Sequence, residues 1–142
     1  MKWKLSVKDI FNASPVLPVM VIKQIEDAEP MAQALLEGGI RVFEITLRTD
    51  VALEAINRIS KAFPEAIVGA GTVINIEQYD AVVKAGAKFA ISPGATEKLL
   101  MHAAKGKIAL VPGTATPSDM MKALELGYDH LKFFPAEVNG GA

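Results

Sequence analysis

Short apolar runs alternate with amphipathic segments along almost the whole chain. The apolar runs cover residues 16–22, 41–47, 66–73, 89–92, 109–112 and 130–136. Each is short and rich in Val, Ile, Leu, Phe or Ala, which predicts a buried strand. The intervening segments 27–37, 51–59, 76–85, 97–105 and 118–126 carry apolar residues at helical spacing. Strands recur roughly every 20 to 25 residues, a period typical of repeated strand–helix units.

Capping residues mark the expected helix ends. Gly86 and Gly127 each follow a predicted helix, where glycine readily adopts the left-handed conformation of a C-terminal cap. We expect Asp50 and Ser118 to cap the N-termini of the second and fifth helices. Ser6 is expected to cap a short helix within residues 1–12. These signals divide the chain into the same units as the apolar runs.

Apolar strands separated by helices indicate an α/β fold with a parallel sheet covered on both faces. The segment that follows the first strand, Ile22 to Glu26, lacks the glycine-rich turn of a dinucleotide-binding sheet. The short and even period therefore favours a (β/α)8 TIM barrel over an open doubly wound sheet. We interpret residues 1–142 as a single barrel domain, with an N-terminal helix at 1–12 and strand–helix units over 16–136.

Only about six of the eight units of such a barrel are present in the chain. Strands 7 and 8 are missing, so the first and sixth strands would each expose an unpaired edge. The sequence leaves three explanations open. The chain is a fragment, it is part of a longer polypeptide, or another chain completes the barrel.

Composition and charge narrow the functional classes. The net charge is −1 and there is no run of Lys or Arg, so we expect no nucleic-acid partner. The chain has no cysteine, which excludes disulfides and thiolate chemistry. Charges interrupt the N-terminus and no apolar run reaches membrane-spanning length, so we expect a cytoplasmic protein without a membrane partner. His102 and His130 are expected to be structural or solvated, and no cluster has metal-ligand spacing, so we expect no metal and no cofactor.

A single lysine, Lys132, interrupts the last apolar run. Burial disfavours the charged form of an amine, so a lysine inside a buried strand is a candidate nucleophile that can form an imine with a carbonyl substrate. The alternative is a lysine whose stem lies on apolar surface while its ammonium group reaches water. Position 132 alone does not separate these two interpretations.

Polar and apolar side chains alternate along the second predicted strand. Its polar face carries Glu44, Thr46 and Arg48, and in a barrel this face points into the lumen. Two opposite charges in a lumen are costly, which indicates a functional site. An arginine at the carboxyl end of a strand is well placed to bind a carboxylate through two hydrogen bonds. A self-satisfied ion pair between Glu44 and Arg48, or an exposed face, remains the structural alternative.

Four segments, in order along the chain, resemble the bacterial 2-keto-3-deoxy-6-phosphogluconate (KDPG) and 4-hydroxy-2-oxoglutarate (KHG) aldolase family. They are Phe43–Thr49, Val68–Val73, Ile91–Gly94 and Lys132–Glu137, and Pro15–Val19 extends the likeness to the first strand. The resemblance implies a lyase, a class I (Schiff-base) aldolase on a (β/α)8 barrel that needs no cofactor. It also implies a cytoplasmic homotrimer of the Entner-Doudoroff pathway of carbohydrate metabolism.

The resemblance assigns roles to six residues. It identifies Lys132 as the Schiff-base lysine, Glu44 as the proton-transfer residue, Arg48 and Thr72 as the groups that hold the pyruvyl carboxylate, and Pro93 and Phe134 as residues that line the pocket. The family continues through two further strands whose glycine-rich loops bind the substrate phosphate, so the phosphate-binding residues are expected beyond Ala142.

The implied reaction is the reversible cleavage of KDPG to pyruvate and glyceraldehyde 3-phosphate, and of KHG to pyruvate and glyoxylate. Two alternatives remain open. The substrate can be 2-keto-3-deoxy-6-phosphogalactonate or another 2-keto acid, or the chain can be a non-catalytic fragment of a barrel.

Overall fold

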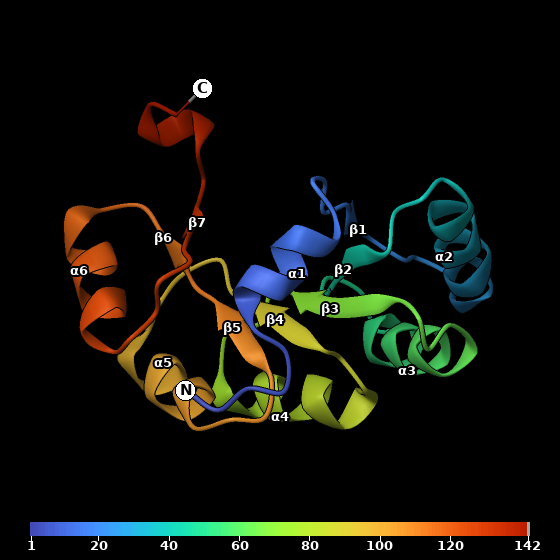
Figure 1. Cartoon of the computed structure of the whole chain (residues 1–142), viewed down its shortest axis with the longest axis horizontal. Helices are drawn as coiled ribbons and strands as arrows, with labels where there is room; N and C mark the ends of the chain where they lie inside the picture. Colours follow the sequence, from blue (N-terminus) through green and yellow to red (C-terminus); the bar gives the residue numbers. More distant parts are fainter. Residues whose placement is uncertain (142) are drawn as a thin grey trace.

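Five parallel strands form one sheet in the computed structural model, which describes residues 1–141. The strands lie side by side in chain order (Figure 1): β1 (Val19–Met20), β2 (Val42–Thr46), β3 (Ile67–Gly71), β4 (Phe89–Ile91) and β5 (Ala109–Val111). The connecting helices are a 3-10 turn, η1 (Ile25–Asp27), followed by α2 (Ala28–Glu37), then α3 (Ala52–Ala62), α4 (Ile76–Ala85) and α5 (Glu97–Ala104). The predicted alternation of parallel strands and helices is confirmed.

A second, two-stranded parallel sheet carries the end of the chain. It pairs β6 (Gly113–Thr114) with β7 (Lys132–Phe133), and α6 (Pro117–Glu125) connects the two strands. The segment after β7 extends away from the five-stranded sheet and contains a 3-10 turn, η2 (Glu137–Asn139), as Figure 1 shows. No helix within residues 1–141 has the length and apolar character needed to cross a membrane.

The sheet separates two apolar cores. The outer core lies between the sheet and the helices, and its strand residues include Phe43, Ile45, Val68, Ala70 and Leu110. The inner core lies on the opposite face, where Val7 and Ile10 of α1 (Val7–Ala13) pack against Val42, Phe89, Ile91, Ala109 and Val111 (Figure 1). Successive side chains of a strand point to opposite faces, so this division reproduces the alternation expected for barrel strands.

Several predicted boundaries are confirmed. Helix α4 covers the predicted residues 76–85, and Gly86 follows it with φ 104°. Gly127 also has a positive φ, 87°, immediately after the C-terminal cap of α6. The Ser6 hydroxyl accepts a hydrogen bond from the Asp9 N–H and so caps α1 as expected.

Two predicted N-caps are wrong. The helix near Asp50 begins at Ala52, and its N-cap, Val51, has helical dihedral angles and makes no side-chain capping bond. Ser118 lies inside α6, whose N-cap is Thr116. Pro117 occupies the first helical position, where its missing N–H costs nothing, and this moves the cap two residues before Ser118.

The first and last predicted strands are shorter than expected. Only Val19–Met20 forms β1, because Pro15 and Pro18 lack the N–H that a strand ladder needs and β1 has β2 as its single neighbour. Only Lys132–Phe133 forms β7. Strand β6 was not expected, since Pro112 interrupts the ladder between β5 and the residues that pair with β7.

The corrected cap of α6 can be tested by mutation. The Thr116 hydroxyl accepts from the Asp119 N–H, and the Asp119 carboxylate accepts from the backbone N–H groups of Thr116 and Ala115, which lower the pKa of Asp119. We expect Thr116→Ala to lower the free energy of unfolding in urea by about 1 kcal/mol. Ser118→Ala is the matched control and should change it by less than about 0.5 kcal/mol. Equal losses of unfolding free energy in the two variants would contradict the assignment of Thr116 as the N-cap of α6.

Candidate functional site

The Glu44 carboxyl is buried on β2, with 2% of the residue exposed. Burial raises the pKa of Glu44, while the positive charges of Lys132 and Arg48 act in the opposite direction. Three charged groups predicted from the sequence therefore interact electrostatically, although they come from β2, from the residues just after it and from β7. A buried carboxyl group is a candidate proton-transfer group when burial raises its pKa and two nearby cations oppose that increase.

Lys132 lies on β7, where its backbone N–H donates to the Pro112 carbonyl at 2.9 Å and its carbonyl accepts from the Thr114 hydroxyl at 3.4 Å. Its Nζ atom lies 4.8 Å from the centroid of the Phe134 ring, close enough for a cation–π contact. The lysine is half-buried and Phe133 is 40% exposed, so the prediction of a buried strand at these residues is wrong. Strand β7 pairs only with β6, which leaves its other edge uncovered among residues 1–141.

Arg48 follows the carboxyl end of β2 and is exposed. No carboxylate of residues 1–141 lies within ion-pair distance of its guanidinium group, so the self-satisfied pair with Glu44 does not form. Thr46, the third polar residue of this strand face, is buried and donates its hydroxyl hydrogen to the Met20 carbonyl at 2.9 Å. Thr46 therefore joins β1 to β2, while Arg48 is available to an incoming carboxylate.

Thr72, directly after β3, has a left-handed backbone with φ 60°. Within the described part of the chain it is the one residue other than glycine with a positive φ. A β-branched residue rarely adopts this conformation, which costs about 1–3 kcal/mol and is concentrated at functional sites. The backbone of Thr72 is thus an independent structural indication of a site at the end of β3.

Pro93 and Phe134 complete the set of predicted residues. Pro93 belongs to the turn after β4, and this turn packs on β6 so closely that a Cβ on Gly113 would lie 2.6 Å from the Ser92 carbonyl oxygen. Gly113 is in register with Lys132 across the small sheet. Arg48, Thr72, Pro93 and Phe134 follow the carboxyl ends of their strands, the end where barrel active sites are found, whereas Glu44 and Lys132 lie within β2 and β7.

Sequence reasoning missed three features of this region. They are the Thr114 hydroxyl bond to the lysine strand, the close packing at Gly113, and the position of Glu44 over Gly71 of β3. A Cβ on Gly71 would overlap Glu44 Oε1 and lie 2.5 Å from Cδ and 2.7 Å from Cγ. The glycines of the segments 69–71 and 112–114 were the available signal, but a glycine alone does not reveal which side chain occupies its space.

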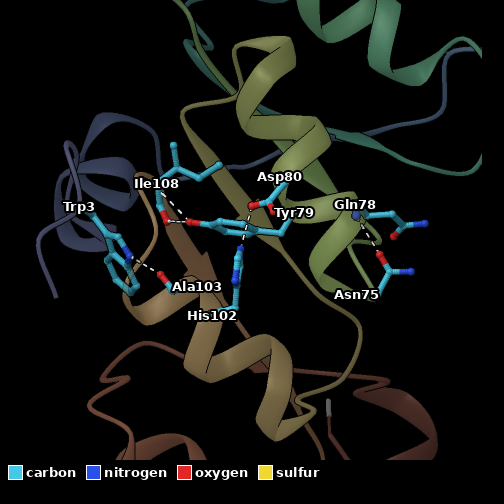
Figure 2. A network of polar contacts seen from close by, with 8 residues as sticks. All are labelled: Trp3, Asn75, Gln78, Tyr79, Asp80, His102, Ala103 and Ile108. Carbon is cyan, nitrogen blue, oxygen red and sulfur yellow. Dashed lines mark hydrogen bonds and ion pairs between the residues drawn. The ribbon is translucent and has the colours of Figure 1, made fainter.

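The two histidines are engaged elsewhere, as expected. Figure 2 shows His102 Nε2 2.8 Å from Asp80 Oδ1, with the His102 ring edge-on to Tyr79 at 5.6 Å. The Tyr79 hydroxyl donates to the carbonyl of Ile108, which precedes β5 at the opposite end of the sheet from the candidate site. His130 Nδ1 lies 2.7 Å from the Asp129 carboxylate, and this bond lowers the pKa of Asp129.

No group of three or more His, Cys, Asp or Glu side chains among residues 1–141 is arranged to hold a metal ion. The predicted site residues Lys132, Glu44 and Arg48 offer an amine, a carboxyl group and a guanidinium group. Such a set can bind a keto acid by its carboxylate, attack its carbonyl carbon and move protons around that carbon.

Comparison with known proteins gives consistent results. A family model described as "KDPG and KHG aldolase" matches residues 7–142. The KHG/KDPG aldolase of Escherichia coli K12 is 55% identical over 139 residues, which cover 98% of this chain and 65% of the relative. The chain thus spans about 65% of the length of the curated relatives it matches.

Two solved structures are similar along most of the chain. The KDPG aldolase of Legionella pneumophila, captured with pyruvate as a covalent carbinolamine, is 52% identical with a TM-score of 0.96, and the match covers 98% of this chain and 68% of that one. The 2-keto-3-deoxy-6-phosphogluconate aldolase of Zymomonas mobilis ZM4 with 3-phosphoglycerate is 51% identical with a TM-score of 0.90, covering 94% and 64%. These TIM-barrel-type relatives support the predicted fold class.

Proposed function

The chain belongs to the KDPG and KHG aldolase family, and we propose that it carries the pyruvate-binding part of a class I aldolase. The reaction is the reversible cleavage of KDPG to pyruvate and glyceraldehyde 3-phosphate, and of KHG to pyruvate and glyoxylate. The observation that carries the proposal is a buried Glu44 carboxyl on which the charges of Lys132 and Arg48 both act.

Binding of the keto acid begins at Arg48. Its exposed guanidinium group forms no ion pair within residues 1–141 and can hold the substrate carboxylate through two parallel hydrogen bonds. The Thr72 hydroxyl donates a further hydrogen bond to the same carboxylate. Pro93 and Phe134 provide apolar walls, and the Phe134 ring also contacts the Lys132 amine. Binding in this orientation sets the C2 carbonyl against the Lys132 nitrogen.

Covalent chemistry follows at C2. The lone pair of the Lys132 amine adds to the carbonyl carbon to give a carbinolamine, which takes up a proton and loses water to form a protonated imine. Removal of the C4 hydroxyl proton then breaks the C3–C4 bond, and its electron pair moves into the imine to give an enamine as the aldehyde leaves. Protonation of the enamine at C3 and hydrolysis of the imine release pyruvate and restore the amine.

Glu44 transfers the protons in this sequence, directly or through a water molecule. The carboxylate accepts the proton of the C4 hydroxyl, and the resulting acid donates a proton to C3 of the enamine. Because burial raises its pKa, Glu44 is a stronger base than an exposed carboxylate and a better match for proton transfer near neutral pH.

The substrate is tested by turnover of a panel. KDPG, KHG and 2-keto-3-deoxy-6-phosphogalactonate are supplied separately, and released pyruvate is measured with lactate dehydrogenase. We expect pyruvate from KDPG and KHG. Release from the phosphogalactonate alone would change the substrate assignment. Absence of pyruvate release from all three substrates would favour a non-catalytic barrel fragment. We also propose that the protein is a cytoplasmic homotrimer, which this turnover experiment does not test.

A further inference from the structure

The Glu44 side chain does not lie over the residue with which it is in register. Glu44 pairs with Gly69 and Thr46 pairs with Gly71 across β2 and β3. The space above Gly69 is filled by the Phe89 ring, whereas the space above Gly71 is filled by the Glu44 carboxyl. Glu44 therefore extends diagonally, two residues along β3, toward the end of the strand where Thr72 lies.

We propose that Gly71 is a positioning residue for Glu44, because the absence of a side chain at position 71 determines where the carboxyl oxygens lie. Its effect on catalysis rests on the proposed function, in which Glu44 transfers protons. The packing of the Glu44 side chain over Gly71 does not depend on that function.

Backbone conformation does not explain a glycine at this position. The positive-φ glycines of the described chain are Gly39, Gly86, Gly127 and Gly140, and Gly71 is not among them. An alanine at 71 is therefore compatible with the strand. The three heavy atoms closest to an added Cβ, Oε1, Cδ and Cγ, all belong to Glu44. The new methyl group would displace the Glu44 side chain before it met any other group.

Displacement of a proton-transfer group by about 1 Å is enough to lower a rate by about 10²-fold. We expect Gly71→Ala to slow exchange of the C3 protons of pyruvate with solvent deuterium by about 10- to 100-fold. Reductive trapping of pyruvate at Lys132 should persist after long incubation, since the amine itself is unchanged. The apparent KM for pyruvate should change much less than kcat, because Arg48 and Thr72 remain in place.

The pH profile separates displacement of Glu44 from a general loosening of the fold. Burial raises the pKa of Glu44 in the native protein. A carboxyl pushed away from β3 toward solvent would lose part of this effect, so the acid limb of the exchange profile should move to lower pH in Gly71→Ala. Loosening elsewhere would lower the rate without moving this limb.

Gly38→Ala is the matched control for a glycine-to-alanine change. Gly38 caps α2 with φ −76°, and its added Cβ would meet only backbone oxygens at 3.4 Å. This variant should exchange pyruvate protons at the wild-type rate and with the wild-type pH profile.

A double-mutant cycle tests the packing without requiring activity. Gly71→Ala, Glu44→Ala and the double variant are unfolded in urea and their midpoints compared. Gly71→Ala should shift the midpoint when Glu44 is present and have little effect in the Glu44→Ala background, because truncation removes the three atoms that the methyl group meets. Equal shifts in both backgrounds would overturn the proposal.

The outcomes for Gly71 and for the proposed function are distinguishable. If wild-type protein traps no pyruvate at Lys132, the proposed function fails, and the urea cycle still decides the packing of Glu44 on Gly71. If wild-type protein traps and exchanges pyruvate and Gly71→Ala exchanges it at the same rate, the positioning role is overturned while the proposed function stands.

Discussion

We expect Lys132→Ala to abolish covalent trapping of pyruvate and to leave the fold intact. Removal of the attacking amine should reduce trapping by about 10³-fold or more, since no other group in the proposed site is a lysine. The expected loss of unfolding free energy is small, because the Lys132 side chain is half-buried and its contact with the Phe134 ring contributes about 0.5–1 kcal/mol. The measurement is mass spectrometry after incubation with pyruvate and borohydride, together with urea unfolding.

Lys122→Ala is the control for this prediction. Lys122 is exposed and forms a surface ion pair with Glu97 at 3.3 Å, so its loss should change neither trapping nor stability appreciably. Unchanged trapping in Lys132→Ala would assign the nucleophile to another residue. Loss of the folded state in Lys132→Ala would mean that the lysine has a structural role that its contacts do not indicate.

Glu44→Gln should slow proton transfer while raising the stability of the folded protein at neutral pH. The substitution keeps the shape of the side chain but removes its ability to accept and return a proton. Exchange of the C3 protons of pyruvate should therefore fall by about 10²- to 10⁴-fold. Glu125→Gln, an exposed substitution on α6, should leave the exchange rate unchanged.

The same variant should be more stable than the wild-type protein at neutral pH. The pKa of Glu44 is raised above the ordinary value of 4.5, so the folded state binds this proton more tightly than the unfolded state does. Its contribution to stability is present below pH 4.5 and is lost as the pH rises through the raised value. The difference in free energy of unfolding between Glu44→Gln and wild type should then shrink as the pH falls toward 4. A variant less stable than wild type at pH 7 would contradict burial as the dominant influence on Glu44.

Helices were predicted more accurately than strands because their signals are local. The period of α4 and the glycine after it lie within a dozen residues, and the structure reproduces both. The N-cap of α6 was placed at Ser118 because several residues nearby can cap a helix. The choice of Thr116 depends on the proline at 117 and on a reciprocal bond with Asp119, which together outweigh the propensity of one serine.

The ends of the sheet could not be predicted because they depend on partners that are distant in sequence. An apolar run indicates a strand but not how many neighbours it has, so 16–22 and 130–136 were both expected to be longer than β1 and β7. The same limit explains why the sequence left open whether Lys132 is buried or reaches water. It lies on a strand that pairs with β6 alone in the described chain.

The chemical groups of the candidate site were proposed from the sequence, but their arrangement could not be predicted from it. Alternation along β2 placed Glu44 on the inner face, where it is indeed buried. Nothing in the sequence indicated that its carboxyl would lie over Gly71, or that Thr72 would adopt φ 60°. Both depend on the register between β2 and β3, which only the folded sheet defines.

The most direct test of the aldolase assignment is intact-mass spectrometry of the wild-type protein after incubation with pyruvate and borohydride, followed by peptide mapping. We predict a single reduced pyruvate adduct on Lys132, which requires borohydride and is absent from Lys132→Ala. A protein that gains no adduct, or gains one on a different lysine, would contradict the proposal that Lys132 forms the imine.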